Sequence, residues 1–244
     1  MFGFVGSISF GKELLESLVK ASKNDVLGDG ISHSDGWGYA LFSNITEKSY
    51  RSTKPIYVDD SSQIFDRFQG KLCGVFHARY SAPNEPKIGP FDSHPFQIRT
   101  GAEIAYLAHN GWIDKKKIGE KFSMPYEMND TEVFASWVER LDGTFIKRME
   151  EGIDFVKNEA LLGSLNLICV IEKRDGTKGI CYYSKYKEEK LYYQLYTLEQ
   201  GKNFAVMSST MAYYLKLLDK KGNILNKKLK TVEQEKLFYK FYEK

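Results

Sequence analysis

All four histidines of this chain stand in short polar clusters. The clusters are "HSDGWG", "FHARYS", "DSHPF" and "AHNG", in which glycine, aspartate, asparagine or arginine lies near the imidazole. A single histidine is more often structural than catalytic, and a single cluster of this kind is compatible with a turn. Most of the clusters, however, fall at the ends of predicted strands, where side chains project into clefts. We therefore take Trp37, His77, His94 and His109 as candidate ligand-binding residues.

The Asn-Gly pair in "AHNG" has two interpretations. It follows the predicted strand "EIAYL", so the side-chain amide of Asn110 and the main-chain N–H of Gly111 are able to converge on one point. That convergence is the geometry of an oxyanion hole. The alternative is an ordinary Asn-Gly turn, which is common between strands. From the residues alone, the turn is the favoured interpretation.

Two charged residues stand at positions that call for a partner. Arg79 ends an apolar strand in "HARYS", where an unpaired charge is costly. Its partner is either a carboxylate ligand or an internal acid such as Asp92 or Glu132. Asp130 lies in the first turn of a predicted helix, "NDTEVFASWVERL". There its carboxylate either complements the helix dipole or binds the ammonium group of a ligand.

Composition limits the classes of protein to consider. The chain has 244 residues, of which 42% are hydrophobic and 14% aromatic, enough to build a sizeable core. No repeat or flexible linker divides it, so we expect one domain over residues 1–244. The formal net charge is +3 and no long basic block is present, which argues against a nucleic-acid partner.

The chain also lacks the signals of membrane, secreted or metal-binding proteins. No apolar run has the length of a membrane span and no segment resembles a secretory signal, so we expect an intracellular, cytoplasmic protein without a membrane partner. Its three cysteines have no paired spacing, which predicts neither a disulfide framework nor a metal site. They are Cys73, Cys169 and Cys181.

The order of the predicted elements favours an α+β fold. Periodicity predicts helices over residues 12–23, 61–70, 129–141, 144–162 and 211–218 and in the lysine-rich tail, 226–244. It predicts strands over residues 2–10, 36–43, 54–60, 71–81, 103–111, 190–199 and 203–210, with a hairpin over 165–186. Strands thus come early, helices in the middle, then strands again and closing helices. This order predicts two packed sheets with helices outside them.

Together the motifs resemble class II glutamine amidotransferase domains of the N-terminal-nucleophile hydrolase superfamily. The short, stand-alone members with a "DGWG" motif are the most similar. The resemblance implies a four-layer αββα sandwich, in agreement with the order of elements above, and we expect neither a cofactor nor a metal. It spans almost the whole chain in the family's order: "MFGFVG", "SDGWGYA", "HARYS", "SHPF", "AHNGWI", "NDTE" and "FAVMSST".

The resemblance also implies roles for individual residues. Arg79 would bind the α-carboxylate of glutamine and Asp130 its α-ammonium group. Asn110 and the N–H of Gly111 would form the oxyanion hole. In this family the nucleophile is a mature N-terminal cysteine, whose thiolate attacks the side-chain amide while its own α-amine shuttles the proton.

The chain departs from the family at the nucleophile itself. Phe2 stands where the family has cysteine, and its side chain has no lone pair for covalent catalysis. Methionine is normally removed only before small residues, so we expect Met1 to stay. Ser7 and Cys73 are poor replacements, because Ser7 lies about 17 Å further along an extended strand and Cys73 lies inside a strand without a base beside it. Two smaller departures are Ala82, where threonine is common, and Thr210, where glutamate is frequent.

The leading hypothesis is an amidotransferase-like protein that keeps a pocket for glutamine or a γ-glutamyl compound but does not hydrolyse it. If the Phe2 ring instead fills that pocket, we expect Arg79 and Asp130 to pair with each other. One alternative is a regulatory protein partner of an amidotransferase or synthetase, with the tyrosine-rich stretch 182–196 as its surface. For that stretch itself, a hairpin with tyrosines alternating between core and water is favoured. A second alternative is an active glutaminase or γ-glutamyl amidase with an unrecognised nucleophile.

Overall fold

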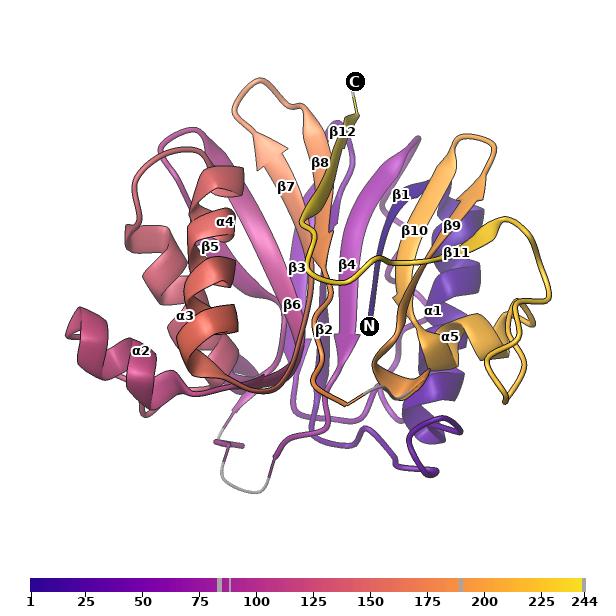
Figure 1. Cartoon of the computed structure of the whole chain (residues 1–244). Helices are drawn as coiled ribbons and strands as arrows, with labels where there is room; N and C mark the ends of the chain where they lie inside the picture. Colours follow the sequence, from indigo (N-terminus) through magenta and orange to yellow (C-terminus); the bar gives the residue numbers. More distant parts are fainter. Residues whose placement is uncertain (83–84, 88, 189–190, 243–244) are drawn as a thin grey trace.

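Two antiparallel sheets stacked face to face form the centre of the protein (Figure 1). The computed structural model describes residues 1–82, 85–87, 89–188 and 191–242. The larger sheet has the strand order β11-β9-β10-β1-β4-β2-β3. Its strands are β1 (Phe2–Gly6), β2 (Trp37–Phe42), β3 (Glu47–Ser52), β4 (Leu72–Ala78), β9 (Leu195–Gln200), β10 (Asn203–Ser208) and β11 (Leu229–Thr231). The smaller sheet has the strands β12 (Phe238–Tyr242), β8 (Lys178–Tyr183), β7 (Leu161–Lys173), β6 (Glu103–Ile113) and β5 (Phe96–Arg99), in that order across the sheet.

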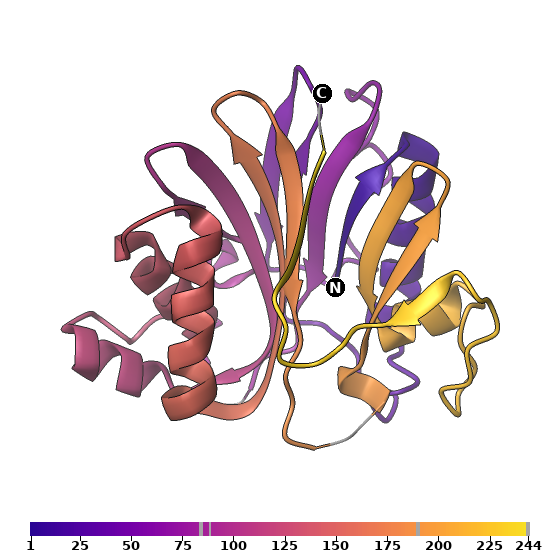
Figure 2. The same ribbon diagram turned by 45° about the horizontal axis from the view of Figure 1, so that its top comes forward.

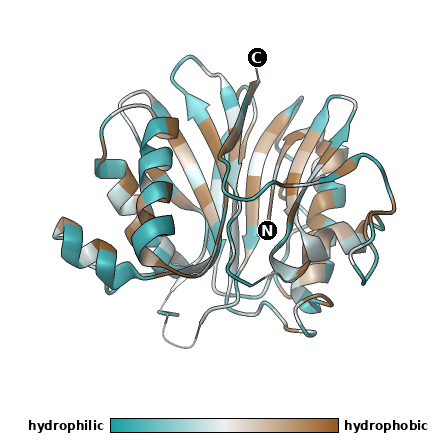
Figure 3. Ribbon diagram, in the orientation of Figure 1, coloured by the Kyte–Doolittle hydropathy of each residue, from teal (hydrophilic) through white to brown (hydrophobic). Residues whose placement is uncertain are grey.

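Helices cover the outer face of each sheet (Figures 1 and 2). The larger sheet is covered by α1 (Ile8–Lys23) and α5 (Ser209–Tyr214). The smaller sheet is covered by α2 (Lys115–Phe122), α3 (Asp130–Arg140) and α4 (Phe145–Phe155). Hydrophilic residues dominate the outward faces of the helices in Figure 3, as expected for amphipathic helices on a core. None of the helices in the described ranges is both long and apolar enough to cross a membrane.

Three hydrophobic cores fill the spaces between the four layers. Alternation along β1 shows how one strand serves two of them: Phe2 and Phe4 face α1, whereas Val5 faces the smaller sheet. The core between the sheets is rich in β-branched side chains, among them Val75, Ile168, Val170, Ile180 and Val206. The predicted α+β fold with αββα layers is therefore confirmed.

Gly3 sets the distance between the two sheets at β1. A Cβ atom at this position would lie 2.6 Å from the Cγ2 of Ile168 and 2.9 Å from the Cδ1 of Ile180, both on the opposite sheet. Contacts this short require atoms to shift, so only glycine fits here without rearrangement. The glycine of the "MFGFVG" motif thus has a packing role that is independent of catalysis.

The first strand is shorter than predicted. It ends at Gly6, and residues 8–10 belong to α1 instead. The cause is Ser7, whose Oγ accepts a hydrogen bond from the N–H of Phe10 at 3.3 Å and so caps the helix. Short elements with weak patterns, namely β3, β5 and α2, were not predicted.

Residues 54–70 form turns instead of the predicted strand and helix. The N–H groups of Val58 and Asp59 both donate to the carbonyl oxygen of Pro55, at 3.0 and 3.1 Å, which folds the first part back on itself. The apolar side chains of the second part are nevertheless buried, as expected: Ile64, Phe65 and Phe68.

The tail contains strands instead of the predicted closing helix. β12 pairs with β8, with Phe238 opposite Tyr182 and their rings stacked at 5.3 Å. An unpaired β8 edge would expose main-chain hydrogen-bonding groups, and pairing with β12 satisfies them. Tertiary pairing therefore overrides the helical pattern. Residues 243 and 244 of the predicted tail helix, and residues 189 and 190 of the tyrosine-rich stretch, lie outside the described residues.

Candidate functional site

A polar cavity of about 80 Å³ lies where the ends of β4 and β10 meet β6 and the start of α3. The residues lining this polar cavity include Met1, Asp25, His33, His77, Arg79, Glu85, His94, His109, Asn110, Gly111, Asp130, Thr131, Tyr192, Ser208 and Thr210. Seven of the residues selected from the sequence are therefore brought together: Arg79, Asp130, Asn110, Gly111 and three histidines. Their chemical roles remain predictions.

Trp37 does not line this cavity. Its ring is buried in the core between the larger sheet and α1, and its indole N–H donates to Asp59 at 3.0 Å. The selection of Trp37 as a ligand-binding residue is thus corrected, because the strand alternation of β2 turns this side chain toward the outer core.

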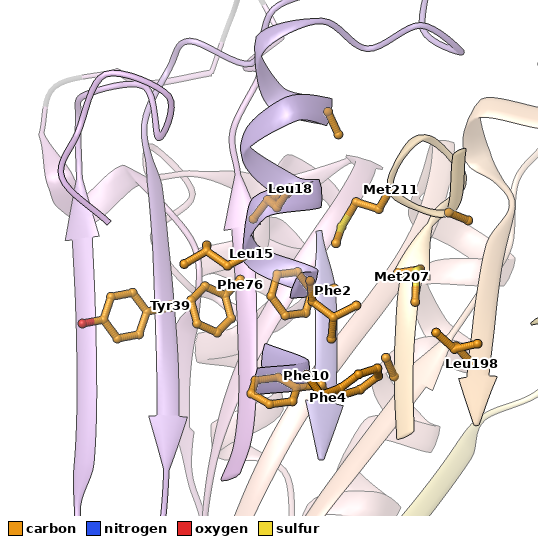
Figure 4. Packing of buried hydrophobic residues seen from close by; sticks show 14 of the residues in the cluster. Phe2, Phe4, Phe10, Leu15, Leu18, Tyr39, Phe76, Leu198, Met207 and Met211 are labelled. Carbon is orange, nitrogen blue, oxygen red and sulfur yellow. The ribbon is translucent and has the colours of Figure 1, made fainter. Parts of the chain in front are cut away.

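The Phe2 ring also lies outside the cavity. It stacks on Phe76 with centroids 4.8 Å apart and planes 5° from parallel, and it is completely buried. Figure 4 shows the Phe2 ring beside Phe76 in the core on the α1 side of β1. The ring therefore does not fill the pocket, and Met1, the preceding residue, lines the cavity instead.

Met1 places an amine at the cavity wall. This amine donates to Ser208 Oγ at 3.5 Å, and the Met1 carbonyl accepts from the Ser208 N–H at 3.1 Å. Burial lowers the pKa of the amine to about 5, against the opposing effect of the negative charge of Asp25. At neutral pH the amine is therefore an unprotonated base next to a hydroxyl group. Neither Met1 nor Ser208 was selected from the sequence.

Arg79 follows β4 directly and is held by the "DGWG" loop. The Arg79 N–H donates to the carbonyl of Gly36 at 2.8 Å, and the Arg79 carbonyl accepts from Asp35 at 3.0 Å. Its Nη2 donates to the carbonyl of Pro86 at 2.8 Å. Burial lowers the pKa of the guanidinium group, although nearby acids oppose this effect. Arg79 and Asp130 both lie in the part of the chain that the structure describes, and no ion pair joins them.

Asp130 begins α3 and shares its surroundings with a second acid. Its Oδ2 accepts from the N–H of Ile113 at 3.0 Å, and its own N–H donates to Glu85 at 3.2 Å. Lys115 pairs with Glu85 at 3.0 Å. Burial, followed by the negative charge of Asp130, raises the pKa of Glu85. Two close carboxylates with one lysine form a region that attracts a further cation.

The three selected histidines form a neutral wall of the cavity. Thr131 Oγ1 lies 3.1 Å from Asp130 Oδ1, 3.0 Å from His94 Nε2 and 2.9 Å from His109 Nδ1, and His109 Nε2 lies 3.4 Å from the carbonyl oxygen of Ser164. The His77 ring lies 4.1 Å from that of His94. Burial lowers the pKa of all three imidazoles, and of His77 and His94 well below the ordinary value. They therefore add no positive charge to the site at neutral pH.

Asp25 and His33 complete the other side and were missed as candidates. Asp25 accepts from Gly28 N at 3.1 Å and from the Thr210 hydroxyl, and it contacts His33 Nε2 at 3.0 Å. His33 belongs to a cluster that the sequence did single out, "HSDGWG". Asp25 carries no comparable signal, because it lies between the C-cap of α1, Asn24, and the turn over residues 26–30.

Asn110 and Gly111 lie inside β6, so the turn interpretation is wrong. β6 continues to Ile113, with a bulge between Gly111 and Ile113 where the pairing with β7 shifts. A Cβ atom on Gly111 would lie 1.8 Å from the carbonyl oxygen of Ser164, so the main chain approaches β7 too closely for any other residue.

Comparison with known proteins finds similarity to solved structures. No family model matches the chain, and no curated protein matches it. Among solved structures, the allosteric regulatory enzyme of purine biosynthesis matches 98% of this chain with a TM-score of 0.66 and 15% sequence identity. The chain therefore shares its αββα fold with the matched part of that enzyme. The match covers 46% of the other chain, so this chain spans about half of its length.

At this level of identity the structural likeness establishes the fold and leaves the chemistry to the site itself. No group of three or more histidine, cysteine, aspartate or glutamate side chains is placed to hold a metal ion in the ranges that the structure describes. What the cavity does contain is a guanidinium group, three acids, neutral imidazoles and two side-chain amides. Such a set binds a small zwitterion by charge and hydrogen bonds.

Proposed function

We propose that this protein is a class II glutamine amidotransferase-like pseudoenzyme that binds glutamine or a γ-glutamyl compound without hydrolysing it. One observation carries the proposal: Arg79 and Asp130 have opposite charges and line the same cavity, yet they form no ion pair. Opposite charges that line one cavity without contacting each other are suited to the two charges of an amino acid, although Asp92, Asp35 and Glu85 also act on Arg79. The resemblance of the motifs supports the same ligand.

In this proposal each end of the amino acid has its own partner. The α-carboxylate meets the guanidinium group of Arg79, and the α-ammonium group meets Asp130 beside Glu85, whose pKa is raised by burial and then by the negative charge of Asp130. The side-chain amide then lies near Asn110 and Gly111, whose donors hold its carbonyl oxygen.

The loss of hydrolysis follows from the position of Phe2. Its ring is packed into the outer core, and the residue offers no nucleophilic atom at the place where the family has one. We further propose that residues 1–244 form a single domain and that the protein is cytoplasmic. The three cores are built on the same two sheets, which supports one domain. The three cysteines are buried and free, which suits a reducing compartment.

A second candidate function is an active amidase, and Ser208 is the observation that favours it. Its hydroxyl lies 3.5 Å from the Met1 amine, whose pKa of about 5 leaves it able to accept a proton at neutral pH. A regulatory protein partner remains the alternative of a different class. The tyrosine-rich stretch supports it less than expected, because Tyr182 and Tyr183 are buried.

Calorimetric titration with L-glutamine tests the proposal. We expect saturable binding that weakens by about 10- to 100-fold in Arg79→Ala, because each hydrogen bond to a charged partner contributes roughly 1.5–3 kcal/mol. Asp130→Asn, which keeps an oxygen for the Ile113 N–H but removes the charge, should weaken binding similarly. Arg140→Ala, at an exposed position of α3, is the matched control and should bind like the wild type. Absence of binding by a folded wild-type protein would overturn the proposal.

An ammonia-release assay separates the pseudoenzyme from the active amidase. We expect the wild-type protein to release no more ammonia from L-glutamine than a heat-denatured sample, since position 2 has no nucleophile. Release by the wild type that disappears in Ser208→Ala would instead favour the second candidate function.

A further inference from the structure

A larger groove adjoins the polar cavity. It measures about 660 Å³ and is lined mainly by aromatic and apolar side chains, including Leu27, Tyr80, Trp112, Leu191, Tyr192 and Tyr193. We call it the aromatic groove. Six of the described residues line both spaces, so the two are continuous: Tyr80, Ala82, Asn110, Gly111, Trp112 and Tyr192. Tyr193, Leu191 and Leu27 line the groove and not the polar cavity.

The two spaces differ in size and in charge. The polar cavity, at about 80 Å³, is well below the roughly 300–1,000 Å³ of ordinary ligand pockets, whereas the groove lies within that range. Arg79, Glu85 and Asp130 line the polar cavity and not the groove. Among the described residues of the groove, Asp29 and Lys220 are charged, with opposite signs. The polar cavity therefore suits a charged head and the groove a neutral, apolar remainder.

The bulge in β6 explains why a tryptophan stands in this groove. Register with β7 shifts between Gly111 and Ile113, and the intervening Trp112 is left 49% exposed. Bulges commonly re-aim one side chain away from the sheet. Tyr80, just after Arg79 on the neighbouring side of the cavity, is 56% exposed. Large exposed aromatic side chains around a concave surface are typical of sites that bind a planar apolar group.

We infer that the preferred ligand is a γ-glutamyl amide whose amide nitrogen carries a neutral aromatic substituent, which binds in the aromatic groove. This inference rests on the proposed function, because it places the amino-acid head in the polar cavity. Free glutamine has a primary amide, so it leaves the groove unoccupied. The groove thus binds the substituent on the amide nitrogen, while the polar cavity binds the amino-acid head.

Calorimetry with three probes tests the inference: L-glutamine, its γ-methylamide and L-γ-glutamylanilide. We expect the anilide to bind at least about tenfold more tightly than L-glutamine, since burial of one aromatic ring contributes on the order of 1.5 kcal/mol. The methylamide should bind nearly like glutamine, because a methyl group buries far less apolar surface than an aromatic ring. It controls for substitution of the amide nitrogen as such.

Two variants test whether the preference for the anilide arises from the groove. Tyr193 lines the groove and not the polar cavity, so Tyr193→Ala should abolish the preference for the anilide while leaving glutamine affinity unchanged. Trp112→Ala should also abolish the preference. Persistence of the preference in both variants would overturn the assignment to the groove.

The outcomes also separate this inference from the proposed function. If glutamine binds in an Arg79-dependent manner but the anilide binds no more tightly, the inference fails and the proposed function stands. If neither glutamine nor the anilide binds to the folded protein, both fail.

Discussion

Phe2→Ala is expected to lower the free energy of unfolding by about 3–5 kcal/mol, the range measured when a buried aromatic side chain is truncated to alanine. The Phe2 ring is completely buried, and its face lies against Phe76 in the core beneath α1. Its removal loses the transfer free energy of the ring and leaves a cavity that the surrounding rings fill only in part. Denaturant unfolding of the wild type and the variant measures this difference.

The matched control for this experiment is an exposed phenylalanine. Phe91 is 73% exposed, so Phe91→Ala should change the free energy of unfolding by less than about 1 kcal/mol. If Phe2 were instead a plug in the cavity, Phe2→Ala would have little effect on stability and would strengthen the binding of glutamine. That result would contradict the position of Phe2 described above.

A fall in pH from 7 to 5 is expected to lower the free energy of unfolding by roughly 4 kcal/mol through His77 and His94. Burial holds the pKa of both imidazoles well below the ordinary value of 6.5, so they stay neutral in the folded protein. In the unfolded chain they take up protons as the pH falls through 6.5. The unfolded state then binds more protons, and stability is lost progressively below that pH.

Denaturant unfolding at pH 7, 6 and 5 measures this dependence. His109 acts in the same direction, and so does the Met1 amine, whose pKa burial lowers from 8.0 to about 5. Glu85 and Glu132, whose pKa values burial raises, favour the folded state at low pH and act mainly near pH 5 and below. His94→Gln, which keeps a side-chain N–H for Thr131, should reduce the loss of stability by roughly 2 kcal/mol, the contribution of one such histidine, if it folds. A stability that does not change between pH 7 and 5 would show that the buried imidazoles are protonated in the folded protein.

Seven residues of the polar cavity were predictable because they sit in motifs whose order follows the fold. Arg79 could be placed at a strand end from the apolar run before it, and Asp130 at a helix start from its capping residues. The direction of the Phe2 side chain was not predictable in this way. It depends on the pairing of β1 with β4 and β10, which sets the face that each residue presents.

Other parts of the site and fold depend on contacts between distant segments. Asp25 meets Thr210 across 185 positions, and no local pattern marks it. The tail becomes β12 because β8 offers an edge, a property of the assembled sheet and not of the tail sequence. The bulge that exposes Trp112 likewise arises from the register between β6 and β7.

The crowding at Gly3 has a consequence for how such chains change over time. Since a side chain at that position would collide with Ile168 and Ile180, the packing of the two sheets is by itself enough to retain the glycine. Selection for folding therefore preserves Gly3 whether or not the residue beside it takes part in a reaction. A glycine at this position is a record of sheet packing and carries no information about catalysis.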